Sequence, residues 1–271
     1  MVFTYYSCRK EFVAEFVPID DKIIIDGWIE QNGNAKVLLT RNFPYFSSFD
    51  SASVRDLILT RAKVTLRADE QTEVLTLTRD DKYFPPYVYV SNEILGEING
   101  NYEIMAEFGG KTAKATTTIP YPVPLDTAYF SPVAGDTIGS VYIEFTDPPG
   151  KHFYRVFTRN DVNSPFISSS IQAISDIYFS EQTFGFYLKK GSSSLLLSSE
   201  DNYYHKGDTV TIKFCTIDQA HYDFWNSFQE EVMNANNPFA ASLTAVNSNV
   251  EGDGLGIWGG YGVNYKTVIL E

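Results

Sequence analysis

The chain has 271 residues, of which 44% are hydrophobic, 15% aromatic and 20% charged. This composition is typical of a folded protein with one large or two modest domains, and it excludes an intrinsically disordered chain. The 34 acidic residues outnumber the 21 lysines and arginines, so the net charge is −13. Such a surface repels phosphate backbones, and we expect no nucleic-acid partner. No stretch reaches the roughly 18 consecutive apolar residues of a membrane-spanning helix.

The start of the chain suggests a lipid anchor. Residues 1–8 read MVFTYYSC, so apolar and aromatic residues lead to a serine directly before Cys8. This pattern resembles the end of a bacterial lipoprotein signal peptide, whose cysteine carries the lipid. Seven residues precede Cys8 and none of them is basic, so an ordinary chain end with a free thiol is the alternative. The other cysteine, Cys215, lies in the apolar run TIKFCTI and is predicted to be buried.

Strand-like patterns fill the first 120 residues. They cover 22–30, 35–43, 62–68, 73–79, 102–108 and 111–119. The QNGN segment at 31–34 and the pair Gly109–Gly110 are typical of tight hairpin turns. We expect residues 1–19 to be a lipoprotein segment and tether, and residues 20–122 to form an antiparallel sandwich of immunoglobulin or transthyretin type. Three prolines in 120–124 favour an extended connector, which places the domain boundary after residue 122.

The strand-like pattern of residues 123–271 predicts a second sandwich, of fibronectin III type. Its clearest strands are 140–145, 152–157 and 208–217. A single helix is predicted at about 219–233, with Asp218 as its N-cap. Tyr222, Trp225, Phe228 and Val232 follow one another at helical spacing, which indicates a stripe facing the core. The fold class is therefore all-β, with two antiparallel sandwiches and one amphipathic helix.

The closing segment GDGLGIWGGYG contains the pattern G-x-G-x-x-G at Gly254, Gly256 and Gly259. A dinucleotide site requires this motif between a strand and a helix, followed by a second strand. Too few residues follow for those two elements. The segment is instead predicted to be a turning loop before the last strand.

Catalytic and metal-binding patterns are missing from the sequence. The histidines, His152, His205 and His221, have no metal-binding spacing between them. Neighbouring acids such as Asp80 and Asp81 point to opposite faces of a strand, whereas paired catalytic acids must face each other. We therefore predict no catalytic residue, no cofactor and no metal site.

Aromatic residues gather in two proline-containing segments, NFPYFSSF and DDKYFPPYVYV. Prolines favour loops or sheet edges at these points. Exposed rings there would stack on a sugar or contact a partner protein. The candidate ligand-binding residues are Tyr45, Phe46, Tyr83, Phe84 and Tyr87. The alternative is that these rings fold back and close the ends of a sandwich.

Several segments, taken in order, resemble one protein family. They are SC at 7–8, KIIIDGWIEQNGNAKVLLTRNFPYF, RAKVTLRAD, GNYEIMAEFGGKTAKATTTIPYPVPLD, CTIDQAHYDFWNSF and VEGDGLGIWGGYG. Together they resemble the bacterial family called domain of unknown function 4249. That resemblance implies an outer-membrane lipoprotein of a Gram-negative bacterium, anchored through Cys8 on the surface or periplasmic face. It also implies a TonB-dependent outer-membrane transporter as partner, and it assigns no catalytic or binding residue.

These observations lead to three hypotheses. The first is a non-catalytic cell-envelope lipoprotein that presents its loops to a ligand or to the transporter. The second is a cell-envelope hydrolase that acts on glycan or peptide through loop carboxylates, for which the candidates are Asp80, Asp81, Glu251 and Asp253. The third is an adhesive or structural surface protein. The ligand and the oligomeric state stay open.

Overall fold

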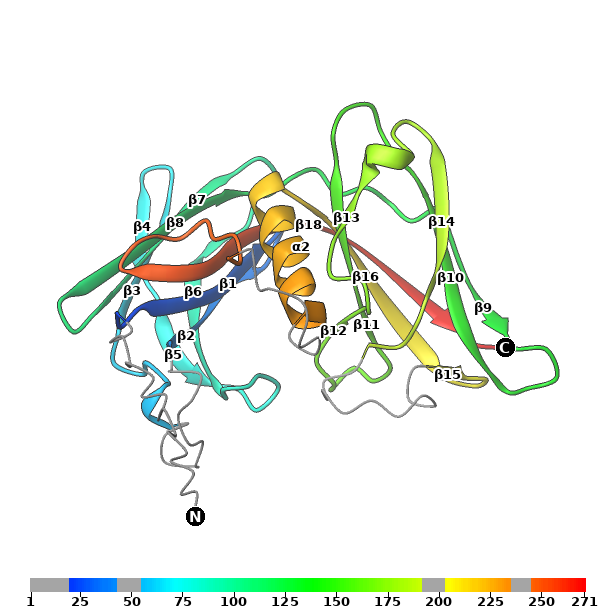
Figure 1. Cartoon of the computed structure of the whole chain (residues 1–271), viewed down its shortest axis with the longest axis horizontal. Helices are drawn as coiled ribbons and strands as arrows, with labels where there is room; N and C mark the ends of the chain where they lie inside the picture. Colours follow the sequence, from blue (N-terminus) through cyan, green and yellow to red (C-terminus); the bar gives the residue numbers. More distant parts are fainter. Residues whose placement is uncertain (1–19, 43–54, 192–202, 235–244) are drawn as a thin grey trace, which may run out of the picture.

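The computed structural model describes residues 20–42, 55–191, 203–234 and 245–271. This part of the chain is all-β, with two sandwiches side by side and one α-helix between them, as Figure 1 shows. The predicted fold class is confirmed. Within these residues, no helix has the length and apolar character needed to cross a membrane.

The first sandwich packs part of a nine-stranded sheet against a five-stranded sheet. Its strands in the nine-stranded sheet are β1 (Ile23–Glu30), β2 (Asn34–Arg41), β5 (Thr76–Arg79) and β6 (Tyr87–Leu95). The five-stranded sheet contains β3 (Lys63–Ala68), β4 (Gln71–Val74), β7 (Asn101–Phe108), β8 (Lys111–Thr118) and β17 (Glu251–Gly252). Both predicted hairpin turns are present, and Gly109 and Gly110 have φ angles of 58° and 80°.

The second sandwich packs the rest of the nine-stranded sheet against a four-stranded sheet. It adds β11 (Phe153–Arg159), β12 (Ile167–Ser168), β13 (Ile174–Ser175) and β16 (Thr209–Ile217) to the large sheet. The four-stranded sheet contains β9 (Thr127–Pro132), β10 (Ile138–Thr146), β14 (Thr183–Leu188) and β15 (Tyr204–His205). A 3-10 turn, η1 (Asp176–Tyr178), precedes β14.

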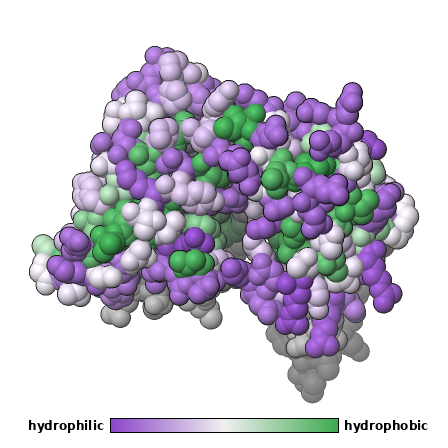
Figure 2. Space-filling model, turned by 180° about the vertical axis from the view of Figure 1, so that it is seen from behind, coloured by the Kyte–Doolittle hydropathy of each residue, from purple (hydrophilic) through white to green (hydrophobic). Residues whose placement is uncertain are grey.

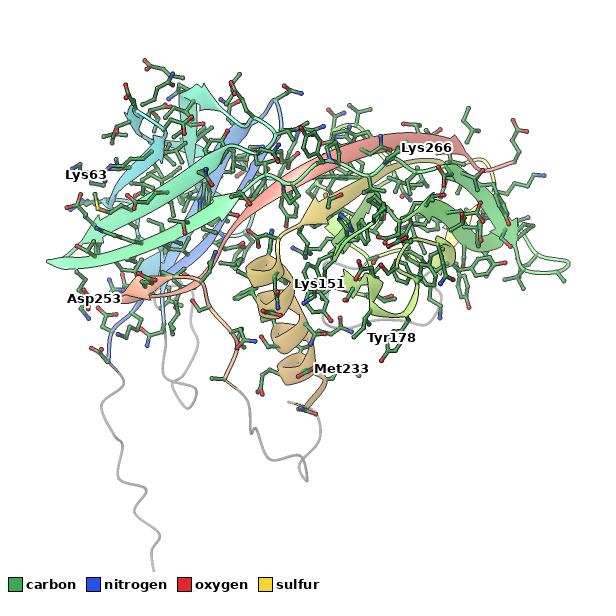
Figure 3. All side chains as sticks on the ribbon, turned by 90° about the horizontal axis from the view of Figure 1, so that it is seen from above. Lys63, Lys151, Tyr178, Met233, Asp253 and Lys266 are labelled. Carbon is green, nitrogen blue, oxygen red and sulfur yellow. The ribbon has the colours of Figure 1, made fainter. Side chains whose placement is uncertain are left out.

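One long strand, β18 (Gly254–Ile269), belongs to both sandwiches. Its first half pairs with β1 in parallel, and its second half pairs with β16 in antiparallel orientation. Figure 3 shows β18 running from Asp253 in the first sandwich to Lys266 in the second. The prediction of a turning loop over the glycines is therefore wrong. The expected division after residue 122 stays a prediction, and the large sheet runs across it.

The alternation of side chains gives the shared sheet two different faces. Ile25 and Trp258 point to the core face, which both smaller sheets cover. Asp26, Tyr261 and Lys213 point to the opposite face. We call this second face the helix face, because the α-helix packs on it. Seen from behind, the sandwiches form two lobes whose hydrophobic residues lie in small separate groups (Figure 2).

Close backbone contacts explain why β18 is rich in glycine. A Cβ atom on Gly260 would lie 2.1 Å from the carbonyl oxygen of Thr118, and one on Gly262 would lie 2.1 Å from that of Pro120. The connector between the sandwiches therefore crosses directly over β18, and only glycine leaves room for it. The glycines serve the junction of the two sandwiches.

The helix α2 (Gln219–Asn234) confirms the predicted range and N-cap. The Asp218 carboxylate accepts a 2.8 Å hydrogen bond from the backbone N–H of His221. The expected core stripe holds for the first half of the helix, where Tyr222 stacks on Phe153. It is wrong for Phe228 and Val232, which are 39% and 44% exposed. α2 packs mainly on β18 and β11, and Met233, near its C-terminal end, is exposed as well.

Candidate ligand-binding groove

A groove of about 590 Å³ lies on the helix face, between the two sandwiches and beside α2. This volume is within the usual range of small-molecule sites. Aromatic and charged side chains make up most of its lining. They include Asp26, Trp28, Glu30, Lys36, Asp80, Lys82, Tyr83, Phe84, Arg155, Phe157, Arg159, Phe166, Lys213, Trp225, Tyr261 and Tyr265.

The charge of the groove is opposite to that of the protein. Five cationic and three acidic side chains line it, whereas the chain carries a net charge of −13. A positive groove in a negative protein attracts anionic ligands over cationic ones. The aromatic rings beside these charges provide flat apolar surface for the uncharged part of a ligand.

Arg155 of β11 joins the elements that form the groove floor. Its side chain is 2% exposed, and its Nη1 donates a 2.8 Å hydrogen bond to the Tyr261 hydroxyl of β18. Its Nε donates to the carbonyl oxygen of Gln172 at 2.8 Å. The guanidinium carbon lies 3.7 Å from the centre of the Trp225 ring of α2. Arg155 therefore fixes the helix to the sheet through the desolvated cation–π contact with Trp225 and the hydrogen bond to Tyr261. It also holds the loop at Gln172.

A buried ion pair lies beside it. The Lys213 ammonium of β16 contacts the Glu30 carboxylate of β1, which also accepts a 3.0 Å hydrogen bond from the Tyr265 hydroxyl. Burial tends to raise the pKa of Glu30, but Lys213 and Tyr265 outweigh it, so the pKa is lowered. Burial, together with the Glu30 charge, raises the pKa of Tyr265. This pair links the two sandwiches across β18 with an ionised carboxylate and a neutral phenol.

Asp26 lies on the groove floor in a different environment. Its side chain is exposed to solvent through the groove opening. Desolvation raises its pKa, and the Arg155 charge only partly opposes this. Among the described residues no hydrogen bond or ion pair to its carboxylate is found. Asp26 is therefore free to accept a hydrogen bond from a ligand.

The structure brings two of the predicted aromatic residues to this groove. Tyr83 packs against Trp28 with ring centres 5.6 Å apart, and its hydroxyl accepts a 3.2 Å hydrogen bond from Lys36. Phe84 lines the rim and is 82% exposed. Tyr87 begins β6 and is half-buried outside the groove lining. Ligand binding by all three residues stays a prediction.

Of the other predicted site residues, only Asp80 is found in the groove lining among the described residues. Cys8, Tyr45 and Phe46 lie outside the described residues. Of the hydrolase candidates, Asp80 lines the groove, whereas Asp81 pairs with Arg79 at 3.0 Å on the surface. Glu251 lies on β17 and Asp253 directly precedes the shared strand, where it accepts a hydrogen bond from the backbone N–H of Thr112.

Asp26, Arg155 and Lys213 were not among the predicted site residues. A signal was present, because each is a charged residue within an otherwise apolar strand. Charged residues inside such strands are seldom buried without a partner. What the pattern does not reveal is that β1 and β16 lie on either side of β18, with β11 next to β16.

The fold and the groove together define an all-β, two-sandwich protein with a charged and aromatic cleft at its junction. The family described as "Domain of unknown function (DUF4249)" matches residues 9–267, and the chain belongs to this family. No curated protein matches the chain. A solved structure described as "Marsupial T cell receptor" is similar at 13% identity and a TM-score of 0.20, covering 73% of this chain and 92% of that one.

Proposed function

We propose that the protein is a non-catalytic cell-envelope lipoprotein that binds an anionic ligand with a flat or apolar part in the groove. The observation that carries this proposal is the local excess of cationic side chains among aromatic rings, within a strongly acidic protein. Arg155 and Lys213 are held by neighbouring groups. Arg159 and Lys36 lie nearer to solvent, and the buried Nε of Arg159 has no hydrogen-bond partner among the described residues. These two cations are the expected contacts for the anionic group.

The binding test uses tryptophan fluorescence, because Trp28 and Trp225 both line the groove. The protein is titrated with matched neutral, cationic and carboxylated oligosaccharides and with acidic peptides. We expect saturable fluorescence changes from anionic probes only. The variant Arg159→Gln should weaken binding roughly tenfold, which is the usual effect of one lost charge-assisted hydrogen bond.

Arg67→Gln is the matched control. Arg67 is an exposed arginine on β3 that pairs with Glu103 at 3.2 Å, away from the groove. Its removal changes the net charge by the same amount, so it should leave binding unchanged. Equal losses in both variants would mean that binding follows overall charge, and binding of neutral probes alone would contradict the proposed ligand class.

The anchor and the partner are further parts of this proposal. They are supported by the serine–cysteine pair at Ser7 and Cys8 and by the resemblance described above. Mass spectrometry of protein isolated from its native membrane should find acyl groups on Cys8. An unmodified Cys8 thiol would remove the anchor from the proposal.

Partnership with a TonB-dependent transporter has its own test. Tagged protein purified from outer membranes after mild cross-linking should recover such a transporter in stoichiometric amounts. A Cys8→Ser variant is the control, because it should lose both the membrane fraction and the transporter. Repeated isolation of the protein alone would contradict an accessory role.

A hydrolase that uses groove carboxylates is the second candidate function. The raised pKa of Asp26 favours it, because a carboxyl that acts as a general acid needs a pKa above its usual value. Asp26 and Glu30 are four residues apart on one strand, which separates their α-carbons by about 13 Å, longer than paired glycosidase acids require. Turnover of glycan or peptide substrates that disappears in Asp26→Asn would establish this candidate instead.

A further inference from the structure

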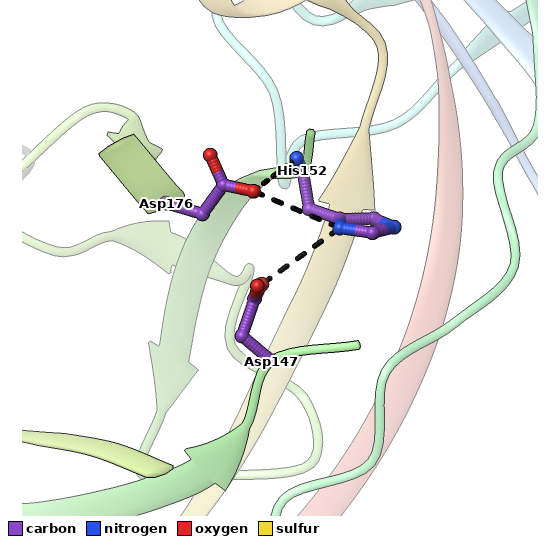
Figure 4. A group of neighbouring side chains, drawn as sticks. All are labelled: Asp147, His152 and Asp176. Atoms are coloured by element: carbon purple, nitrogen blue, oxygen red, sulfur yellow. Dashed lines mark hydrogen bonds and ion pairs between the residues drawn. The ribbon is translucent and has the colours of Figure 1, made fainter. Parts of the chain in front are cut away.

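Three chain segments bring metal-binding side chains together at one end of the second sandwich. Asp147 directly follows β10, His152 directly precedes β11, and Asp176 opens η1. Figure 4 shows the His152 imidazole facing both carboxylates. One ligand atom from each residue can be chosen so that all three lie within 4.8 Å of one another. The cluster is separate from the groove and from its lining residues.

The two carboxylates are buried, and His152 is the group that would pair with them if it were protonated. Asp147 is 2% exposed and Asp176 is 3% exposed. Asp147 accepts hydrogen bonds from the Tyr154 hydroxyl and from the backbone N–H of Glu181, and Asp176 accepts one from the backbone N–H of His152. Within the described residues, no lysine or arginine forms an ion pair with either. Burial of an uncompensated carboxylate is strongly unfavourable, so two neighbouring ones need a cation, which is either a protonated His152 or a bound metal ion.

The imidazole nitrogen between them has no hydrogen-bond partner among the described residues. Nδ1 of His152 is buried, 3.9 Å from the Asp147 carboxylate and 3.7 Å from that of Asp176. Both distances exceed those of hydrogen bonds. If Nδ1 is unprotonated, its lone pair faces two negative oxygens. If it is protonated, its N–H has no acceptor within hydrogen-bond distance. A metal ion between the three atoms would satisfy the nitrogen and both carboxylates at once.

We propose that Asp147, His152 and Asp176 bind a divalent transition metal ion, with Zn²⁺ the best fit. Zinc accepts imidazole and carboxylate ligands at about 2.0–2.2 Å, which places tetrahedral ligand atoms about 3.4 Å apart. The observed separations from Nδ1 are longer by only a few tenths of an ångström. Calcium is a poor fit, because it prefers six to eight oxygen ligands. Three protein ligands leave the fourth zinc position to water.

Such an ion would tie together the turn after β10, the start of β11 and the turn η1. These segments are already joined by the pairing of β11 with β13, by backbone hydrogen bonds and by the hydrogen bonds of the two aspartates. The residues that follow Asp176, Ile177 and Tyr178, are exposed, and Figure 3 shows Tyr178 pointing outward from the second sandwich. The metal would therefore have a structural role, fixing an exposed turn to the end of the sandwich.

Isothermal titration of ZnCl₂ into chelator-treated full-length protein tests this proposal. We expect one bound zinc ion per chain and a higher melting temperature with zinc present. His152→Gln should weaken binding by roughly tenfold or more and remove the shift in melting temperature. The matched control is His205→Gln, because His205 is an exposed histidine on β15 outside the cluster.

A second variant covers the case in which His152→Gln fails to fold. Asp176→Asn keeps an oxygen acceptor for the backbone N–H of His152 while removing the charge, so it should fold and still lose zinc. Circular dichroism confirms folding in each case. Equal zinc affinity in wild type and both variants, or no saturable binding in wild type, would overturn the proposal. Tighter binding of Ca²⁺ than of Zn²⁺ would overturn the choice of metal.

Discussion

The imidazole ring of His221 lies directly over Gly259: a Cβ atom added to Gly259 would lie 2.1 Å from Cε1 of His221. His221 is on the first turn of α2 and is 1% exposed, and its ring lies 4.7 Å from that of Tyr261. Burial and the nearby Arg155 charge lower its pKa, so the ring stays neutral. This contact sets how closely the helix packs on the shared strand.

The variant Gly259→Ala should therefore be strongly destabilised. Its methyl group has no free space, so either the His221 ring or the helix must move, at a cost of about 3 kcal/mol. Urea unfolding followed by circular dichroism measures the change in free energy of unfolding. Gly33→Ala is the control, because a Cβ atom there meets its nearest neighbours at an ordinary 3.4 Å. In a His221→Ala background the cost of Gly259→Ala should largely disappear, and its persistence would contradict the steric explanation.

Much of the fold was predictable because its signals are local. Alternating apolar residues mark β1, β7, β8 and β16, and the turn chemistry at Gly109–Gly110 fixes a hairpin. The segment 254–262 was wrongly predicted to be a turning loop, because glycine runs usually indicate turns. Here they allow a distant segment, 118–120, to cross a strand, and contacts of that range leave no local pattern.

The groove was predictable only in part. Prolines beside Tyr83 and Phe84 indicated a loop or sheet edge, where Phe84 is exposed at the groove rim and Tyr83 packs against Trp28. The charged floor depends on a single strand that pairs with β1 on one side and β16 on the other. Parallel pairing of residues more than 200 positions apart is not encoded in any short window of sequence.

The Lys213–Glu30 pair should contribute strongly to stability. Lys213→Met leaves the half-buried Glu30 carboxylate without its cation, and breaking a buried pair from one side costs about 3 kcal/mol. Chemical denaturation measures this loss. Lys63→Met is the matched control, since Lys63 pairs with Glu107 on the exposed surface at 3.1 Å, where a pair contributes about 1 kcal/mol or less. The double variant Lys213→Met, Glu30→Gln should recover part of the loss, and full additivity would argue against a coupled pair.

Asp26→Asn should stabilise the protein at neutral pH. The pKa of Asp26 is raised in the folded state, so between the unfolded value of 3.8 and the folded value the native state holds more protons than the unfolded state. Stability therefore falls as pH rises through this window, and the ionised carboxyl is unfavourable at pH 7. Asparagine removes that cost. The gain should fade as pH falls through the raised pKa, and a gain unchanged below pH 3.8 would contradict this assignment.

Glu30→Gln should show the opposite pH dependence. The folded pKa of Glu30 is lowered, so its contribution is present above the unfolded value of 4.5 and is lost as pH falls through the folded pKa. The variant should be less stable than wild type at neutral pH, and the difference should shrink on acidification. Melting curves of Asp26→Asn and Glu30→Gln, recorded from pH 3 to pH 8, show directly whether their stabilities change with pH in opposite directions.

The Cys215 thiol should be unreactive in the native protein. It is fully buried, and burial raises its pKa to about 12, so at pH 8 only about one thiol in ten thousand is the reactive thiolate. In a Cys8→Ser background Cys215 is the sole cysteine of the chain. Ellman's reagent should then modify it only at the rate at which the second sandwich opens, and within seconds in 8 M urea. Because β16 carries Cys215 beside the shared strand, rapid modification in native buffer would mean that this strand pair opens readily, contrary to a rigid junction between the sandwiches.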